Sequence, residues 1–135
     1  MALPLAAAPL RESRERPDLV DEQSPRGLRV VQITTNPNLA SWNVYTEAPV
    51  FTPDSRRFVF IRERNYWLCD IADGFALRQL TDERGAKGAS VSPDGKWMYY
   101  IVDDAERTGA ALVLKRLSLD NFRRKVIFTV KDKLP

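Results

Sequence analysis

Few residues of this chain are suited to catalysis. The sequence has no histidine among its 135 residues, and its one cysteine is Cys69. This composition excludes Ser-His-Asp and Cys-His arrangements, histidine-ligated metals and an internal disulfide. Cys69 alternates with Trp67 and Ile71 in an apolar run, so we expect a buried structural thiol that no neighbouring group activates. We assign no catalytic residue and no metal ligand to this chain.

The residues best suited to binding lie within and after a long polar loop, residues 35–47. An indole can stack on a sugar ring, an asparagine can hydrogen-bond to hydroxyl groups, and a tyrosine can do either. Guanidinium groups can bind carboxylates. The candidates are Trp42, Asn43, Tyr45, Arg62 and Arg64, with Arg84, Lys87 and Arg107 near the same face. Two alternatives remain open: the aromatic residues only cover a strand edge, and acids in the same loops offset the arginines.

The charge and the hydropathy of the sequence do not indicate binding to nucleic acid or to a membrane. The net charge of +3, without a Lys/Arg run, does not indicate nucleic-acid binding. No apolar run reaches the roughly 18 residues of a membrane span. Residues 1–27 contain four prolines and make a poor signal peptide, so we expect a flexible tail and a cytoplasmic location. The acidic cluster Asp103, Asp104 and Glu106 lacks the glycine and the bidentate glutamate of a calcium loop.

The elements that position the candidate residues come from a repeat. Residues 48–61 recur 40 positions later as residues 88–101. Each copy contains a short apolar strand, a Pro-Asp turn, one or two cations and a dense apolar strand. Asp94-Gly95 between two such strands is a strong hairpin signal, and Asp54-Ser55 is a weaker form of it. Repeats of this length are typical of propellers and solenoids.

A second marker recurs in step with the first. Val-Gln-Ile-Thr at residues 31–34 precedes the first copy, and Arg-Gln-Leu-Thr at residues 78–81 precedes the second. Val-Ile-Phe-Thr at residues 126–129 follows the second copy. The pattern predicts nine strands, one leading and two sets of four. They are residues 28–33; residues 48–52, 57–62, 66–71 and 77–81; and residues 89–92, 96–102, 111–117 and 125–130.

The second strand of each set is apolar on both sides, so both of its faces must be covered. Sheets packed face to face provide such cover. We therefore predict an all-β fold of two four-stranded antiparallel β-propeller blades plus a leading strand, an incomplete propeller. The expected division is a tail at 1–27 and a partial propeller at 28–135, with blade one at about 48–81, blade two at about 88–130 and polar outermost strands.

Strand direction places the loops. We expect one face of the blades to carry the loops 35–47, 63–65, 82–88 and 103–110. We expect the opposite face to carry the turns 53–56, 72–76, 93–95 and 118–123.

Three features resemble the TolB-like propeller repeat. They are Ser-Pro-Asp-Gly-Lys at 92–96, the aromatic-rich strand after it, and Gln-Leu-Thr at 79–81. The first unit departs from this pattern at Thr52, Ser55 and Arg56, which stand where the second unit has Ser, Gly and Lys. The resemblance covers residues 28–130.

A narrower resemblance lies in the Gln-Ile-Thr strand, the Asn/Pro loop and residues 45–54. Together they resemble the opening of oligogalacturonate lyases, propeller enzymes of pectin breakdown. The resemblance implies a seven-bladed propeller and β-elimination on short galacturonate chains. It also implies manganese, held mainly by histidines of later blades, and an acidic oligosaccharide as the partner of the complete protein.

The leading hypothesis is a piece of such a propeller without activity of its own, which self-associates when isolated. The alternatives are a protein-binding TolB-like segment and the propeller of a prolyl-oligopeptidase-like serine peptidase.

Overall fold

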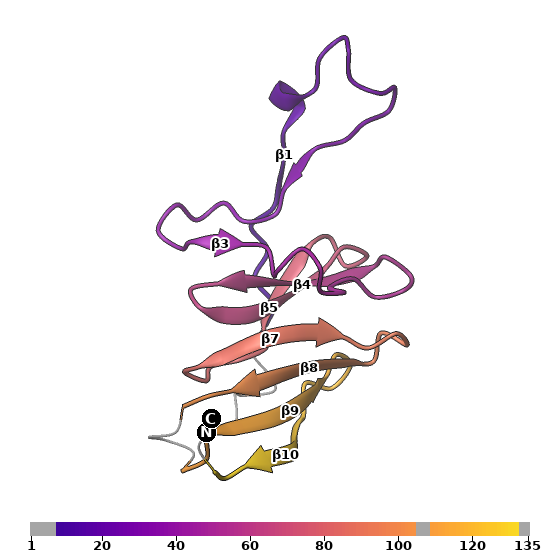
Figure 1. The fold of residues 1–135 in the computed structure, drawn as a ribbon. Helices are drawn as coiled ribbons and strands as arrows, with labels where there is room; N and C mark the ends of the chain where they lie inside the picture. The colour runs from indigo at the N-terminus through magenta and orange to yellow at the C-terminus, as the bar shows by residue number, and fades with distance from the viewer. Residues whose placement is uncertain (1–7, 105–108, 133–135) are drawn as a thin grey trace.

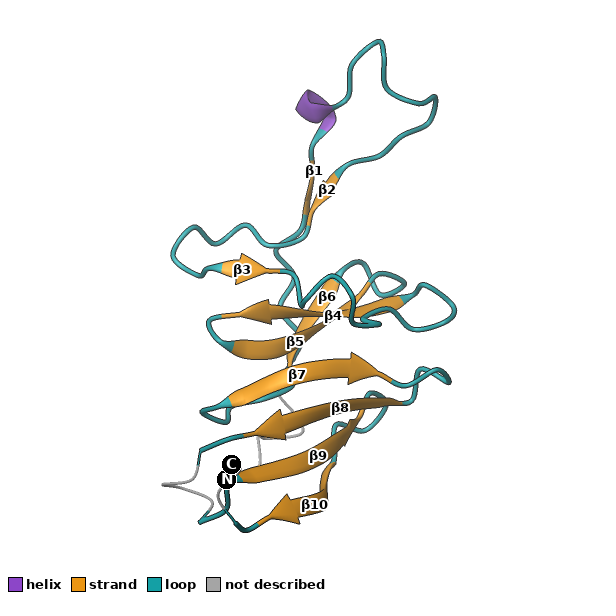
Figure 2. Ribbon diagram, viewed as in Figure 1, coloured by secondary structure: helices purple, strands orange, loops and turns teal. Residues whose placement is uncertain are grey.

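The structure is a computed structural model that describes residues 8–104 and 109–132. Two four-stranded antiparallel sheets are stacked face to face, and an arm extends away from the first sheet (Figures 1 and 2). The described residues contain no α-helix, only the 3₁₀ turn η1 at Pro17–Leu19. No helix among them is long and apolar enough to cross a membrane. The predicted all-β fold of two propeller blades is confirmed.

The first sheet, blade one, has the order β3-β4-β5-β6. The second, blade two, has the order β7-β8-β9-β10, with β7 innermost by its place in the repeat. In blade one the strands are β3 Ser41–Trp42, β4 Arg57–Arg62, β5 Asn65–Asp70 and β6 Ala76–Gln79. In blade two they are β7 Ala86–Val91, β8 Trp97–Val102, β9 Leu112–Ser118 and β10 Arg124–Val130.

The Pro-Asp turns have the same geometry in both blades. The Thr52 hydroxyl donates to Asp54 Oδ1 at 2.6 Å, and the Ser92 hydroxyl donates to Asp94 Oδ1 at 2.6 Å. The backbone N–H of the residue two positions after each aspartate also donates to that carboxylate, at 3.0 Å in both blades. These hydrogen bonds, the hydroxyl bond being the larger cause, lower the pKa of Asp54 and of Asp94.

The third residue of each turn adopts a left-handed conformation, with φ of 57° at Ser55 and 71° at Gly95. Glycine adopts this conformation without a steric penalty, and serine does not. Gly95 is also the close contact between blades, because a Cβ there would lie 2.7 Å from Pro53 Cδ. The hairpin signals at both positions were therefore correct, and the glycine of the second copy serves packing as well.

The second recurring marker contains Gln-x-Thr at residues 32–34 and 79–81, and its glutamine forms a local hydrogen bond at the end of a strand. Gln79 Nε2 donates to the Thr81 carbonyl at 2.7 Å, and Gln32 Nε2 donates to the Thr34 carbonyl at 3.0 Å. In blade one the Thr81 hydroxyl also accepts the Tyr66 N–H at 2.9 Å, which ties the end of β6 to β5.

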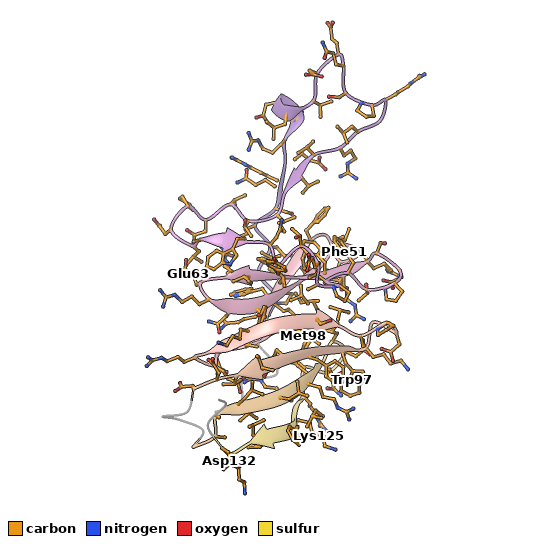
Figure 3. All side chains as sticks on the ribbon, in the orientation of Figure 1. Phe51, Glu63, Trp97, Met98, Lys125 and Asp132 are labelled. Carbon is orange, nitrogen blue, oxygen red and sulfur yellow. The ribbon has the colours of Figure 1, made fainter. Side chains whose placement is uncertain are left out.

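The main core lies between the two sheets. Alternate residues of β4 and β5, among them Val59 and Leu68, meet Met98 and Tyr100 of β8 there. Figure 3 places Met98 inside this stack. A second, smaller cluster of Phe60, Cys69 and Leu77 lies on the opposite face of blade one. Strands β4 and β5 are thus covered on both faces, as their lack of alternation predicted.

The innermost strand of blade one differs from the prediction. The regular pairing with β4 is made by Ser41–Trp42, whereas residues 48–52 contribute an isolated bridge between Phe51 and Phe58. Pro49 has no N–H to donate, and its carbonyl accepts the Val91 N–H of blade two at 2.8 Å. Residues 50–52 still pair with β4, since the Thr52 N–H donates to the Arg57 carbonyl at 2.9 Å and the Val59 N–H donates to the Val50 carbonyl at 3.0 Å. Strand β3 adds further pairing with β4 within the segment that was predicted to be a loop.

The arm comprises residues 8–34. Its strands β1, Arg14–Glu15, and β2, Val31–Gln32, pair antiparallel and project beyond blade one (Figures 1 and 2). Only residues 31–32 of the predicted leading strand 28–33 are paired. Leu10 forms an antiparallel bridge to Leu77 through two backbone hydrogen bonds of 2.9 Å. The described part of the predicted tail is therefore attached to the outer edge of β6.

The prediction of polar outermost strands was wrong for blade one. Leu77 and Leu80 are buried, because Leu10 covers the outer edge of β6 and blade two covers one of its faces. In blade two, β10 has no such cover among the described residues, and Val126, Ile127 and Phe128 are exposed.

Candidate functional site

An open cleft of about 700 Å³ lies at one end of the blade stack. It is lined by the β4–β5 turn at 63–65, the β6–β7 loop at 82–85, and residues 103–104 after β8. These connections lie at the left in Figure 1, and Figure 3 places Glu63 at that end and Trp97 at the other. The common face predicted for these loops is confirmed, while residues 105–108 of the last loop lie outside the described residues.

The β4–β5 turn presents Arg64 to this cleft. Its two residues, Glu63 and Arg64, both have positive φ, 49° and 65°. Two-residue hairpin turns with positive φ at both positions usually contain Asn-Gly or Asp-Gly. Other residues are sterically strained in this conformation. The Ala40 N–H donates to Glu63 Oε1 at 2.5 Å, and the Glu63 N–H donates to the Ala40 carbonyl at 3.0 Å. These bonds hold the turn against the polar loop that precedes β3.

A partly buried polar network forms the blade-two wall of the cleft. Glu83 accepts hydrogen bonds from the Tyr100 hydroxyl at 2.8 Å and from Lys115 Nζ, and Arg124 bridges Glu83 and Asp82 at 3.3 and 2.9 Å. Desolvation raises the pKa of Glu83, but the hydrogen bonds from Lys115 and Tyr100 outweigh it, so the pKa is lowered overall. Burial, and then the bond to Glu83, raise the pKa of Tyr100. The carboxylate of Glu83 is therefore held in its ionised form.

Of the five binding candidates, only Arg64 lines this cleft. Trp42 is 47% exposed on β3, Tyr45 is 74% exposed, and Asn43 is exposed between them. These three residues lie on the strand and loop next to the β4–β5 turn, since Trp42 pairs with Ile61. The exposed aromatic faces leave the sugar-stacking hypothesis open. Trp42 lies on the edge strand β3, so the alternative in which the aromatic residues only cover the strand edge remains open as well.

Arg62 is not an accessible binding residue. Its side chain is 0% exposed, its Nη2 lies 2.7 Å from Glu12 Oε1 of the arm, and its guanidinium lies 5.3 Å from the ring centre of Trp67. Glu12 also accepts the Thr35 N–H at 3.1 Å. The arginine therefore fastens the arm to blade one. No local pattern indicated this pair, because its two residues lie on segments far apart in the sequence.

The residues described do not fit the manganese site that the family resemblance implies. They contain no group of three or more Asp, Glu, Cys or His side chains placed to hold an ion. Cys69 is buried as predicted, and burial, with a smaller contribution from Asp70, raises the pKa of its thiol to about 12. At neutral pH this thiol is protonated and is neither a nucleophile nor a metal ligand.

On the opposite face of the stack, polar contacts join the two blades. Arg57 Nη1 donates to the Leu119 carbonyl at 2.8 Å and lies 3.0 Å from Asp120 Oδ1. A smaller cavity of about 260 Å³ lies beside it, lined in part by Arg78, whose guanidinium lies 5.4 Å from the Phe122 ring centre. These contacts join the turns of the two blades and support a structural role for this face.

Similar solved structures are propeller proteins. An oligogalacturonate lyase in complex with manganese is 24% identical, with a TM-score of 0.63, over 92% of this chain and 30% of its own. The oligogalacturonate lyase from Vibrio parahaemolyticus is 22% identical, with a TM-score of 0.68, over 92% of this chain and 32% of its own. A putative TolB from Agrobacterium tumefaciens is 27% identical, with a TM-score of 0.51, over 76% of this chain and 34% of its own.

These likenesses confirm the expected resemblance to TolB-like propellers and to oligogalacturonate lyases, and they show the fold. The chain spans about a third of the length of these structures. No protein-family model matches the sequence. No curated protein matches it either.

Proposed function

We propose that this chain supplies two blades of a propeller that binds short galacturonate chains. The observation that supports the proposal most is the extent of the structural likeness. Both lyase structures match 92% of the chain, whereas the TolB structure matches 76% with a lower TM-score. The proposed contacts are stacking of sugar rings on Trp42 and Tyr45 and pairing of uronate carboxylates with arginine.

The chain by itself is proposed to bind without catalysing elimination. Removal of a proton next to a uronate carboxylate requires a base and a group that stabilises the resulting enolate charge. The sequence has no histidine, and Lys87 is exposed and forms an ion pair with Asp103. A manganese ion with histidine ligands would have to come from other blades.

Calorimetric titration with digalacturonate and trigalacturonate tests the binding proposal, with maltotriose as the uncharged control. We expect heat of binding from the acidic sugars only. Release of unsaturated product, with and without manganese, is measured in parallel, and we expect none. Absence of binding by either galacturonate would refute the proposed function. Manganese-dependent turnover that Arg64→Gln abolishes would instead place an active site in these two blades.

A protein-binding role is the second candidate, and the arm favours it. Leu19 and Leu28 are both exposed on the projecting arm, where an apolar contact with another protein could form. A variant with Leu19→Ser and Leu28→Ser separates the two candidates, since it should leave galacturonate binding unchanged.

A further inference from the structure

We propose that Arg64 and Arg84 form a paired anion site across the cleft, for a short linear ligand that carries two carboxylates. The two residues approach the cleft from different segments, the β4–β5 turn and the β6–β7 loop. The site follows from the pairing of charges around the cleft. Only the choice of a di-uronide as the ligand rests on the proposed function.

The cleft is acidic by composition, since five carboxylates and two guanidinium groups line it. Each carboxylate, however, has its own partner. Glu63 accepts the Ala40 N–H, Asp82 pairs with Arg124, Glu83 pairs with Lys115, Asp103 pairs with Lys87, and Asp104 is also engaged.

The two arginines that line the cleft differ from these acids. In the described part of the chain, neither the Arg64 nor the Arg84 side chain has a hydrogen bond, an ion pair or a ring contact, and both residues are exposed. Each of these two guanidinium groups is therefore available to bind a carboxylate of a ligand. The cation partners of Asp82, Glu83 and Asp103 come from outside the lining residues and offset these three acids, so the cleft is not strongly acidic. An anion would be attracted by the two guanidinium groups themselves and not by the net charge of the cleft.

Both arginines are carried by backbone that is held in place. Arg64 itself has φ of 65° in a turn that two hydrogen bonds fasten to Ala40. Next to Arg84, Gly85 has φ of +79°, and a Cβ there would lie 3.3 Å from the backbone carbon of Asp103. The Asp103 N–H donates to the Gly85 carbonyl at 3.3 Å. A ligand therefore meets two anchored positions rather than two mobile loops.

The geometry favours carboxylates on separate groups of one ligand. A guanidinium binds a carboxylate through two parallel hydrogen bonds, and each arginine here is free to bind one. The cleft volume of about 700 Å³ is large enough for a disaccharide. Because the cleft is open to solvent, binding should weaken as the salt concentration rises.

Titration of the whole chain with digalacturonate at low salt tests the site. We expect Arg64→Gln and Arg84→Gln each to weaken binding about tenfold or more, and the double variant to lose it. Arg56→Gln is the matched control, since Arg56 is exposed in the Pro-Asp turn 53–56 of the opposite face. Its affinity should equal that of the wild type. The midpoint of thermal unfolding should not change in any of the variants, because none of these side chains has a partner within residues 8–104 and 109–132.

Citrate and inorganic phosphate serve as further probes. Loss of citrate binding in both arginine variants, without any digalacturonate binding to the wild type, would support the anion site and refute the galacturonate proposal. Phosphate bound more tightly than citrate would refute the requirement for two carboxylates. Digalacturonate binding that is equal in wild type and double variant would refute the paired site and leave the proposed function standing. No binding of any probe would refute both.

Discussion

The two blades share their turns but differ in what covers them. Leu80 of blade one and Phe128 of blade two each directly precede the threonine of the recurring marker, Thr81 and Thr129. Leu80 is 1% exposed in the core between the blades, whereas Phe128 is 61% exposed. Blade two covers the face that bears Leu80, and no described residue covers the equivalent face of blade two. Burial in this fold is therefore decided by the neighbouring blade and not by the strand itself.

The opposite faces of the blades show the same rule. Arg62 of β4 and Val102 of β8 are equivalent in the 40-residue repeat, and both are buried. Val102 packs in the apolar core against blade one, whereas Arg62 meets Glu12 of the arm. Blade one covers the inner side of blade two, and the arm covers the corresponding side of blade one. A charged residue is tolerated there because the arm supplies a carboxylate.

The largest predicted effect concerns β10, the uncovered outermost strand of blade two. Three neighbouring apolar side chains of β10, Val126, Ile127 and Phe128, are exposed, and such a surface drives association. We expect the isolated chain to self-associate in a concentration-dependent manner in sedimentation velocity. Phe128→Ser should shift the distribution toward monomer, whereas Tyr45→Ser, at an exposed aromatic residue of blade one, should not. A wild type that is monomeric at all concentrations would contradict this prediction.

The second prediction concerns the arm. Glu12→Gln leaves the buried Arg62 guanidinium without its charge partner, which should lower the free energy of unfolding by about 3 kcal/mol. Denaturant titration measures this loss. The double variant Glu12→Leu with Arg62→Met should recover most of it, because an apolar pair can replace a buried ion pair. If Glu12→Gln left the stability unchanged, the arm would not be attached to blade one in solution.

The third prediction tests the contact between the Pro-Asp turns. Gly95→Ala adds a Cβ at φ of +71° and 2.7 Å from Pro53 Cδ. We expect a loss of about 2–3 kcal/mol in the free energy of unfolding, from backbone strain and overpacking together. Gly27→Ala is the matched control, since Gly27 has φ of +80° with no atom within 4 Å of the added Cβ. Equal losses in the two variants would show that strain alone is responsible.

The fourth prediction is a pH dependence that arises from Glu83 on the blade-two side of the cleft. The pKa of Glu83 is lowered in the folded protein, so its ionised form stabilises the fold above its usual pKa of 4.5. That contribution is lost as the pH falls below 4.5 and through the folded pKa. Glu83→Gln should therefore be less stable than the wild type by roughly 1–2 kcal/mol at neutral pH, and the difference should shrink in acid. A difference that does not vary with pH would exclude this carboxylate as its source.

The smallest predicted effect has the opposite sign. Ser55 has φ of 57° where blade two has glycine, so Ser55→Gly should relieve left-handed strain. We expect a gain of about 0.5–1 kcal/mol, since the entropy lost by glycine offsets part of the relief. Ser55→Ala keeps the strain and should give no gain when the two variants are compared by thermal unfolding.

The features of the fold that depend on neighbouring residues could be predicted from the sequence. The Pro-Asp turns, the strand order and the burial of Cys69 depend on residues close in the sequence or on an apolar run that must be covered. The common face of the cleft loops followed from strand direction alone. In contrast, the position of Arg62, the inner strand of blade one and the burial of Leu80 were not predictable from local pattern.

The sequence alone determined that this protein is built from a repeated four-stranded unit, because hydroxyl, carboxylate and glycine positions define each hairpin within a few residues. The tertiary structure decided which charges remain free. Glu12 reaches Arg62, and Lys115 and Arg124 reach the acids of the cleft, only after the sheets stack and the arm docks. Among the described residues, Arg64 and Arg84 are left without partners by the same packing, since charge pairing depends on distances in space that the order of residues does not fix.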